Sequence, residues 1–408
     1  MFNEIIAAWN PEIFTTTLSE WVNGISVNSV IMMIMMIFML VGALDKIRGN
    51  KLGYGEEFDN GFNAMGPLAA AMAGVVAAAP VLALLLKPFI VPIYKLVGAD
   101  PSMFATTLLA CDMGGYPLAM QLAENPAIGN FSGLILGTMM GPTIVFTIPV
   151  ALSIIKAEDR PYLGAGVLAG LITVPLGCIA GGLAMNMTQY ALPLKVILVN
   201  LIPVIVIAGV ICAGLWIIPD KMIAGFNKFG NFVTALITAL TAIAVFEYIT
   251  GIKLPIFNIM VEADADGVVP LESGLLVCGQ IAIVLIGAFP MVKWITKTFG
   301  GVLQKIGNAL GMNADASAGM VANLANNIAM FNIMGEMDPK GKLLNVAFAV
   351  SAAFVFGDHL GFTAGNNQGM VTPVIVGKLV AGITAIIVAN LLSPVLLAKI
   401  KEILEEKK

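Results

Sequence analysis

The stretch LLACDMGGYPLA, residues 108–119, places an acid, a pair of glycines and a proline inside a segment that is otherwise apolar. The acid is Asp112, and a carboxylate at membrane depth costs about 2.5–3.5 kcal/mol on insertion scales, so it is a functional hypothesis by default. Glycine and proline interrupt a helix. An interrupted helix lies inside a membrane only where its freed backbone groups face protein or a water-filled cavity. The stretch therefore predicts a broken, buried segment.

The composition places this stretch in a membrane. Of 408 residues, 59% are hydrophobic and only 11% are charged, against roughly 25% charged in soluble domains. Many uncharged runs reach the length of about 20 residues that a spanning helix needs, and strand-like alternation is absent. The sequence predicts an all-α polytopic membrane protein. A net charge of −4 gives no basic footprint for nucleic acid.

Two kinds of apolar segment follow one another along the chain. We expect two re-entrant hairpins, 100–123 and 313–336, which are interrupted by DMGG and ANLANN and follow shorter amphipathic pieces at 88–98 and 295–310. The alternative is eleven spanning helices, with each hairpin crossing as one kinked helix. The nine predicted crossings lie near residues 25–45, 64–86, 131–155, 163–187, 195–218, 230–250, 273–292, 343–362 and 370–397.

The interruptions belong to an internal repeat. PVLALLLKPF from Pro80 matches PMVKWITKTF from Pro290, and GPTIVF from Gly141 matches GDHLGF from Gly357. These short matches occur in order, at an offset of 210 to 216 residues. We therefore expect two units, 62–190 with the first hairpin and 272–400 with the second.

Charge indicates that the two units have inverted topology. Bases follow the second hairpin at Lys340 and Lys342, but the matching loop AENPAIGN has none. Lys156 and Arg160 follow the 131–155 helix, and the counterpart loop TAGNNQG again has none. The positive-inside rule then puts equivalent loops on opposite sides of the membrane, with the C-terminus in the cytoplasm.

The remaining segments flank and link the repeats. Residues 1–23 lack a basic n-region, so they form either an amphipathic surface helix or a variable extension, and not a cleaved signal peptide. The predicted divisions outside the repeats are the N-terminal extension 1–23, the first helix and cytoplasmic loop 24–61, the linking helices and acidic outer loop 191–271, and the cytoplasmic tail 401–408.

Inverted repeats with broken helices are typical of secondary transporters, whose binding site lies at the repeat interface near the middle of the membrane. Local roles remain as alternatives: Asp112 or Asp358 as helix caps, His359 in a local hydrogen bond, and Asn326 and Asn327 as turn residues. The candidate substrate-binding residues are Asp112, Asp358, Asn326, Asn327, Asn367, Thr143, His359, Tyr116, Asn366, Gly114, Gly115 and Asn323.

This set of side chains favours one class of substrate. Two carboxylates, several amides and nearby aromatic rings, with no lysine at mid-depth, suit a small cation that carries a hydrogen-bonding group. We expect no cofactor and no metal, because the four cysteines lie in apolar segments without paired spacing. A single histidine and the lack of HExxH and GxSxG motifs argue against an enzyme.

Five stretches carry a resemblance to the bacterial ethanolamine-utilisation permeases: TLLACDMGGY, SGLILGTMMGPTIVFTIPVAL, GVLAGLITVPLGCIAGGLAM, NLANNIAMF and AFAVSAAFVFGDHLGFTAGN. The resemblance covers roughly residues 25–395 and implies a multi-pass protein of the bacterial inner membrane. It also implies import of ethanolamine, mainly as the protonated cation, by a uniporter or a cation-coupled transporter. A passive channel for small neutral amines or ammonia is the alternative. The expected partners are ethanolamine and the lipid bilayer, and assembly into a homo-oligomer stays open.

Overall fold

Helices form the whole framework of the described chain. The computed structural model describes residues 10–265 and 267–406, and no strand occurs among them. The first half contains α2 (Pro11–Asn23), α3 (Val27–Ile47), α4 (Tyr54–Asn63), α5 (Met65–Leu96), α6 (Ser102–Leu108), α7 (Tyr116–Leu122), α8 (Pro126–Asn130), α9 (Met140–Pro142), α10 (Ile148–Ile154), α11 (Arg160–Leu171) and α12 (Val174–Ala184). The second half contains α13 (Leu194–Ile217), α14 (Pro219–Thr250), α15 (Pro270–Ala309), α16 (Ala314–Ala325), α17 (Asn327–Asn332), α18 (Pro339–Ala352), α19 (Asp358–Asn366) and α20 (Val371–Glu406).

Seven helical segments of the described chain are long and apolar enough to cross a membrane. The count becomes eight if α11 and α12, which meet at a bend of 41°, form one span. The segments differ in depth within the protein: 83% of the apolar window of Pro126–Ile154 is buried, but only 11% of that of α3. The protein is therefore a multi-pass membrane protein, with Pro126–Ile154 at its centre and α3 at its rim.

Two details of the predicted topology differ from the structure. The crossing expected at 343–362 is broken between α18 and α19, and neither piece is long enough to span on its own. The amphipathic pieces expected at 88–98 and 295–310 are not separate, since α5 and α15 run through them. Helix α5 continues past three internal prolines, which neighbouring helices make tolerable in a membrane protein.

The two breaks predicted by the sequence are present. The segment that contains DMGG is interrupted between α6 and α7, and the segment that contains ANLANN is interrupted at Asn326, between α16 and α17. Each is preceded by one long helix and followed by a broken one, in the same order in both halves of the chain.

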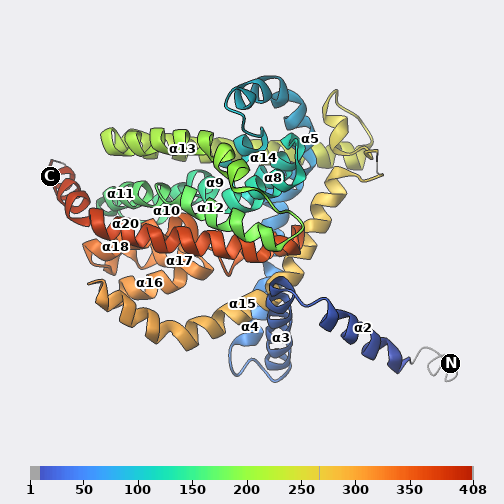
Figure 1. Cartoon of the computed structure of the whole chain (residues 1–408), viewed down its shortest axis with the longest axis horizontal. Coiled ribbons are helices and arrows are strands. Elements are labelled where there is room, and N and C mark those ends of the chain that lie inside the picture. The colour runs from blue at the N-terminus through green and yellow to red at the C-terminus, as the bar shows by residue number, and fades with distance from the viewer. Residues whose placement is uncertain (1–9, 266, 407–408) are drawn as a thin grey trace.

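Small residues hold the centre of the molecule together. Helix α11 packs along α18, and α12 packs along α20, and Figure 1 shows these helices side by side. A Cβ added at Gly170 would lie 2.5 Å from Val350, and one added at Gly177 would lie 2.5 Å from Ala381. Such close contact of backbones is the usual way in which helices associate in membranes.

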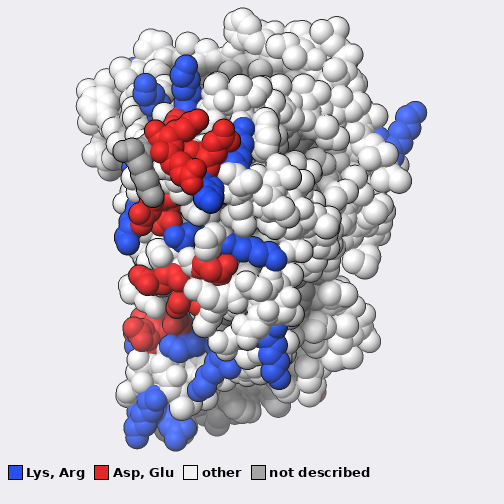
Figure 2. All heavy atoms as spheres, turned by 90° about the vertical axis from the view of Figure 1, so that its left-hand side faces the viewer, with Lys and Arg blue, Asp and Glu red and all other residues white. Residues whose placement is uncertain are grey.

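Charged side chains gather at one end of the molecule. Figure 2 looks onto the end that carries the C-terminus in Figure 1, and its lysines, arginines and acids lie mostly in one band. Lys342 from α18 binds Asp159, with 2.5 Å between Nζ and Oδ1, and Lys156 approaches Gly335. The loops that the positive-inside rule assigned to one side therefore meet in space.

The N-terminal extension contains one helix. Helix α2 projects from the body of the molecule in Figure 1. Residues 1–9 of the extension and 407–408 of the tail lie outside the described residues.

Candidate functional site

The break in the first hairpin is built by close backbone packing. Gly114 has a φ of +91°, a conformation that side chains with a Cβ rarely adopt. A Cβ there would also lie 2.3 Å from Val75, and a Cβ on Gly115 would lie 2.6 Å from the carbonyl oxygen of Ala110. Both glycines thus shape the turn that presents Asp112, and neither offers a side chain to a ligand.

Each broken span packs on the hairpin of its own half through a glycine. A Cβ on Gly141 would lie 1.9 Å from the carbonyl oxygen of Leu109, and one on Gly357 would lie 2.2 Å from that of Ala325. Leu109 is the C-cap of α6, and Ala325 is the last residue of α16. The two halves of the chain therefore use the same contact at the same place.

The freed backbone amides between α18 and α19 donate hydrogen bonds to the end of α16. The amide of Phe354 donates to the carbonyl of Asn323 at 3.0 Å, and that of Phe356 donates to Leu324 at 3.0 Å. Phe354 has a φ of +63°, an uncommon conformation for a bulky residue that tends to mark functional sites. The broken helix is thus accommodated without exposing backbone to lipid.

A small cavity lies between the break at DMGG and the two broken spans, the second of which is broken between α18 and α19. Its volume is about 50 Å³, and a single water needs roughly 10–15 Å³ on this measure, so a molecule of about four heavy atoms fits. Asp112 comes from the first break, and Asp358 and His359 come from the start of α19. The lining residues are Ala110, Asp112, Pro142, Phe146, Phe354, Asp358 and His359.

Neither acid is a helix cap. Helix α7 begins after Gly115 and α19 begins after Gly357, and both lack a side-chain cap. Asp358 lies in the first turn of α19, where the helix dipole favours a negative charge. The Asp112 carboxylate accepts a weak contact from Cys111 Sγ at 4.0 Å. Both carboxylates are therefore directed to the cavity and are not used to start a helix.

A larger cavity adjoins the small one on one side. Its volume is about 760 Å³, and both Asp112 and Asp358 line it as well. Asn326 lines it too, while its Oδ1 accepts the amide of Ile328 at 2.7 Å and so caps α17. The Nδ2 group of Asn326 remains as a donor beside the two acids. Three of the twelve predicted residues thus meet in one water-accessible space.

A second large cavity, of about 620 Å³, lies on the other flank of the first hairpin. Tyr116, Phe362 and Asn366 line it together with Glu262 from the acidic loop. The rings of Tyr116 and Phe362 meet edge to face with centroids 5.9 Å apart. Asp112 and Tyr116, four positions apart in the sequence, face different cavities.

The other predicted residues make contacts within the protein. Thr143 donates to the carbonyls of Met139 and Val350, and Asn327 Nδ2 donates to Thr147. Asn323 Nδ2 lies 3.3 Å from the carbonyl of Asn345, and Asn367 Nδ2 donates to Asn130 at 2.9 Å. The Oδ1 atoms of Asn323 and Asn327 are buried without a hydrogen-bond partner. These four residues connect elements around the cavities.

Lys378 is the polar residue that the sequence analysis missed. It lies on α20, is 1% exposed and donates from Nζ to the carbonyl of Thr138 at 2.6 Å. Its Nζ also lies 3.0 Å from Nδ1 of His359. The expectation of a site without lysine at mid-depth is therefore wrong. The signal was present, because Lys378 interrupts an apolar run of a spanning helix, and such residues mark functional sites.

Cys111, Asp112 and His359 also lie together. Their ligand-type atoms are all within 4.8 Å of one another, a spacing that a metal site requires. The Lys378 amino group, however, lies 3.0 Å from Nδ1 of His359, and it brings a positive charge next to the three residues. The donor set therefore fits an organic cation beside two acids better than it fits a metal ion.

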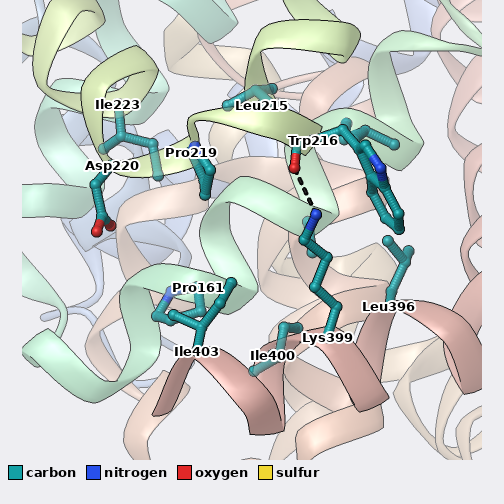
Figure 3. A pocket seen from close by; sticks show the side chains of 12 residues that line it. Pro161, Leu215, Trp216, Pro219, Asp220, Ile223, Leu396, Lys399, Ile400 and Ile403 are labelled. Atoms are coloured by element: carbon teal, nitrogen blue, oxygen red, sulfur yellow. Dashed lines mark hydrogen bonds between the residues drawn. The ribbon is translucent and has the colours of Figure 1, made fainter. Parts of the chain in front are cut away.

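A further pocket lies far from these residues along the chain, at the end of α20. Figure 3 shows it between Pro161, the turn from α13 to α14 and the last turns of α20. Lys399 crosses it, donating to the carbonyl of Trp216 at 2.6 Å with Nζ 3.8 Å from the centre of the indole ring. The other side chains are mostly apolar, apart from Asp220, whereas two acids line the central cavity.

Comparisons with known proteins agree on one family. The family model described as "Ethanolamine utilisation protein, EutH" matches residues 27–392. The chain is 52% identical to a probable ethanolamine permease of Listeria monocytogenes, over 89% of this chain and 93% of that protein. It is 50% identical to proteins of the same description from Escherichia coli and Salmonella typhimurium, in each case over 90% of this chain and 96% of the relative. No solved structure matches the chain. The chain therefore belongs to the EutH family of ethanolamine utilisation proteins.

Proposed function

We propose that this protein imports ethanolamine, mainly as the protonated cation, across the bacterial inner membrane. The relatives described as probable ethanolamine permeases support the substrate. The observation that carries the proposal is the cavity of about 50 Å³ in which Asp112 and Asp358 face one another from two helix breaks. A four-heavy-atom cation fits this space and these charges.

The two ends of the substrate call for different partners. An ammonium group donates up to three hydrogen bonds, and the two carboxylates can accept them as charge-assisted bonds. Phe146 and Phe354, whose rings meet edge to face at 5.8 Å, add aromatic surface to the same cavity. The hydroxyl group can then reach Asn326, whose Nδ2 has no role in capping α17. Asn327 and Asn367, which are engaged by Thr147 and Asn130, hold surrounding elements.

The placement of the cavities favours alternating access over an open pore. Asp112 lines one large cavity and Tyr116 lines the other, so the turn of the first hairpin separates them. An alternating-access carrier needs such a barrier beside its binding site, because the site must open to only one side of the membrane at a time. The passive channel for neutral amines or ammonia, by contrast, needs one continuous path. We assign the acidic loop to the outside and the basic loops, with the C-terminus, to the cytoplasm.

The similar order of elements in the two halves supports transport at the interface of two inverted repeats. The matched contacts of Gly141 and Gly357 fall at positions that the repeat aligns. Inverted repeats allow the two halves to exchange conformations, which opens the site to each side in turn. The carrier operates either as a uniporter or with a coupled cation.

Uptake of labelled ethanolamine into proteoliposomes tests this function. We expect saturable uptake with counterflow, and loss of most uptake in Asp112→Asn and in Asp358→Asn. Asp59→Asn is the matched control, because Asp59 on α4 pairs with Lys46 on α3 and lines neither large cavity. Wild-type uptake by both cavity variants would refute the site, and uptake without saturation or counterflow would favour the channel.

A further inference from the structure

A buried lysine lies behind the proposed cation site. Lys378 does not line the small cavity or either large one. It contacts the broken span of the first half at Thr138 and the start of α19 at His359, and a ring nitrogen of His359 lies within 4.8 Å of a carboxylate oxygen of Asp112. Its ammonium group thus reaches the site through charge and not through contact with a substrate.

We propose that Lys378 determines the charge of substrate that this site accepts, by cancelling one of its two carboxylates. Asp112 and Asp358 line the same small cavity and bring two negative charges that repel one another, and Lys378 brings one positive charge. One net negative charge remains, which a single monovalent cation neutralises. This inference rests on the proposed function and adds the reason for selecting a monocation.

Electrostatics in a buried site makes this charge count matter. Two carboxylates that are close together in a medium of low polarity repel strongly, and each needs a counter-charge. Neighbouring charges interact far more strongly in such a site than they do in bulk water. One charge too many or too few at the cavity therefore changes the affinity for a cation by a large factor.

The position of the lysine is fixed by its helix. The neighbouring Gly377 packs against the carbonyl of Gly177, which a Cβ would approach to 3.0 Å, so the backbone of α20 is anchored on α12.

The first half of the chain has no counterpart of this lysine. The alignment of LAGLIT from Leu168 with VAGIT from Val380 places Gly166 at the equivalent position. Only the second half supplies a charge there.

Four forms of the protein separate this role from a structural one. The wild type has one net negative charge at the site, Asp112→Asn has none, Lys378→Met has two, and the double variant Lys378→Met/Asp112→Asn has one again. The probes are ethanolamine hydrochloride and ethylenediamine dihydrochloride at mildly acidic pH, where both amines of the diamine are protonated. The two cations have the same length, so they differ in charge and not in size.

The measurement is the dissociation constant of each probe, from ligand-dependent thermal stabilisation of the purified protein. The preference is the ratio of the dissociation constants of ethanolamine and ethylenediamine. In Lys378→Met we expect this ratio to change in favour of the dication by roughly tenfold or more. In the double variant the preference should return to within about threefold of wild type, and ethanolamine should bind more tightly than to Asp112→Asn alone. Lys399→Met is the control, since Lys399 lies at the end of α20 and not at the site.

Two results would overturn the inference. One is an unchanged preference in Lys378→Met, and the other is a double variant that binds ethanolamine no better than Asp112→Asn. The comparison of the double variant with Asp112→Asn remains valid even if Lys378→Met alone does not fold. The double variant lacks the Asp112 carboxylate, so the loss of Lys378 leaves no second acid without a counter-charge. If the wild type binds neither probe, the proposed function fails. If it binds ethanolamine but the variants do not reorder the probes, only the role of Lys378 fails.

Discussion

At the scale of single residues, Asn326 does two things that one substitution can separate. Its Oδ1 caps α17, which leaves Nδ2 as a donor, and the residue lines the large cavity that contains the two acids. Serine keeps a capping oxygen but removes the amide donor. We expect Asn326→Ser to fold normally and to bind ethanolamine roughly 3–10-fold more weakly, which is the range of one neutral hydrogen bond.

Ethylamine, which lacks the hydroxyl group, is the control ligand for that variant. Its affinity should stay the same in Asn326→Ser, because the substitution removes no partner of the ammonium group. The measurement is competition with labelled ethanolamine in proteoliposomes. Equal loss for both amines would show that Asn326 supports the site and does not recognise the hydroxyl group.

At the scale of the elements, the two matched glycines hold the broken spans against the hairpins. Alanine at Gly357 would put a Cβ 2.2 Å from the carbonyl oxygen of Ala325, so one of the two segments must move. We expect Gly357→Ala to lower the free energy of unfolding by about 1–3 kcal/mol, the usual cost of overpacking. The substitution should also reduce transport, because Asn326 and Asp358, which follow Ala325 and Gly357 in the chain, both line the large cavity.

Thermal unfolding in detergent measures this effect, with Gly209→Ala as the matched control. No atom lies within 4 Å of a Cβ at Gly209, inside α13, so alanine there should be neutral or slightly stabilising. Equal melting of the two variants would mean that the contact at Gly357 does not hold the break.

The sequence predicts these breaks better than it predicts the lengths of the helices. Glycines and asparagines mark the interruptions at 109–115 and at Asn326, because local backbone chemistry decides where a helix stops. The prolines of α5 do not by themselves predict whether the helix ends or continues, because this depends on whether neighbouring helices satisfy the backbone groups that each proline frees. Lys378 shows the same limit. A lysine in a long apolar helix shows its role only when packing places Thr138 and His359 beside it.

At the scale of the whole molecule, the two large cavities allow carrier and channel to be told apart. Gln121 lines the cavity next to the acidic loop, and Ser153 lines the cavity that contains the two acids. In an alternating-access carrier, opening one cavity closes the other. We therefore expect ethanolamine to change the reactivity of Gln121→Cys and Ser153→Cys toward a membrane-impermeant maleimide in opposite directions.

The two cysteines should also react from opposite sides, Gln121→Cys from outside the cell and Ser153→Cys from the cytoplasm. Gln121 shares its cavity with Glu262 of the acidic loop, and Ser153 lies three residues before Lys156 of a basic loop. Of the native cysteines, three are buried and Cys212 is half-buried, so the background labelling should be low. The matched control is Glu402→Cys on the last turns of α20, which lines neither large cavity and should react from the cytoplasm at a rate independent of ethanolamine. Reactivities at 121 and 153 that rise or fall together would instead indicate a pore that opens along its whole length.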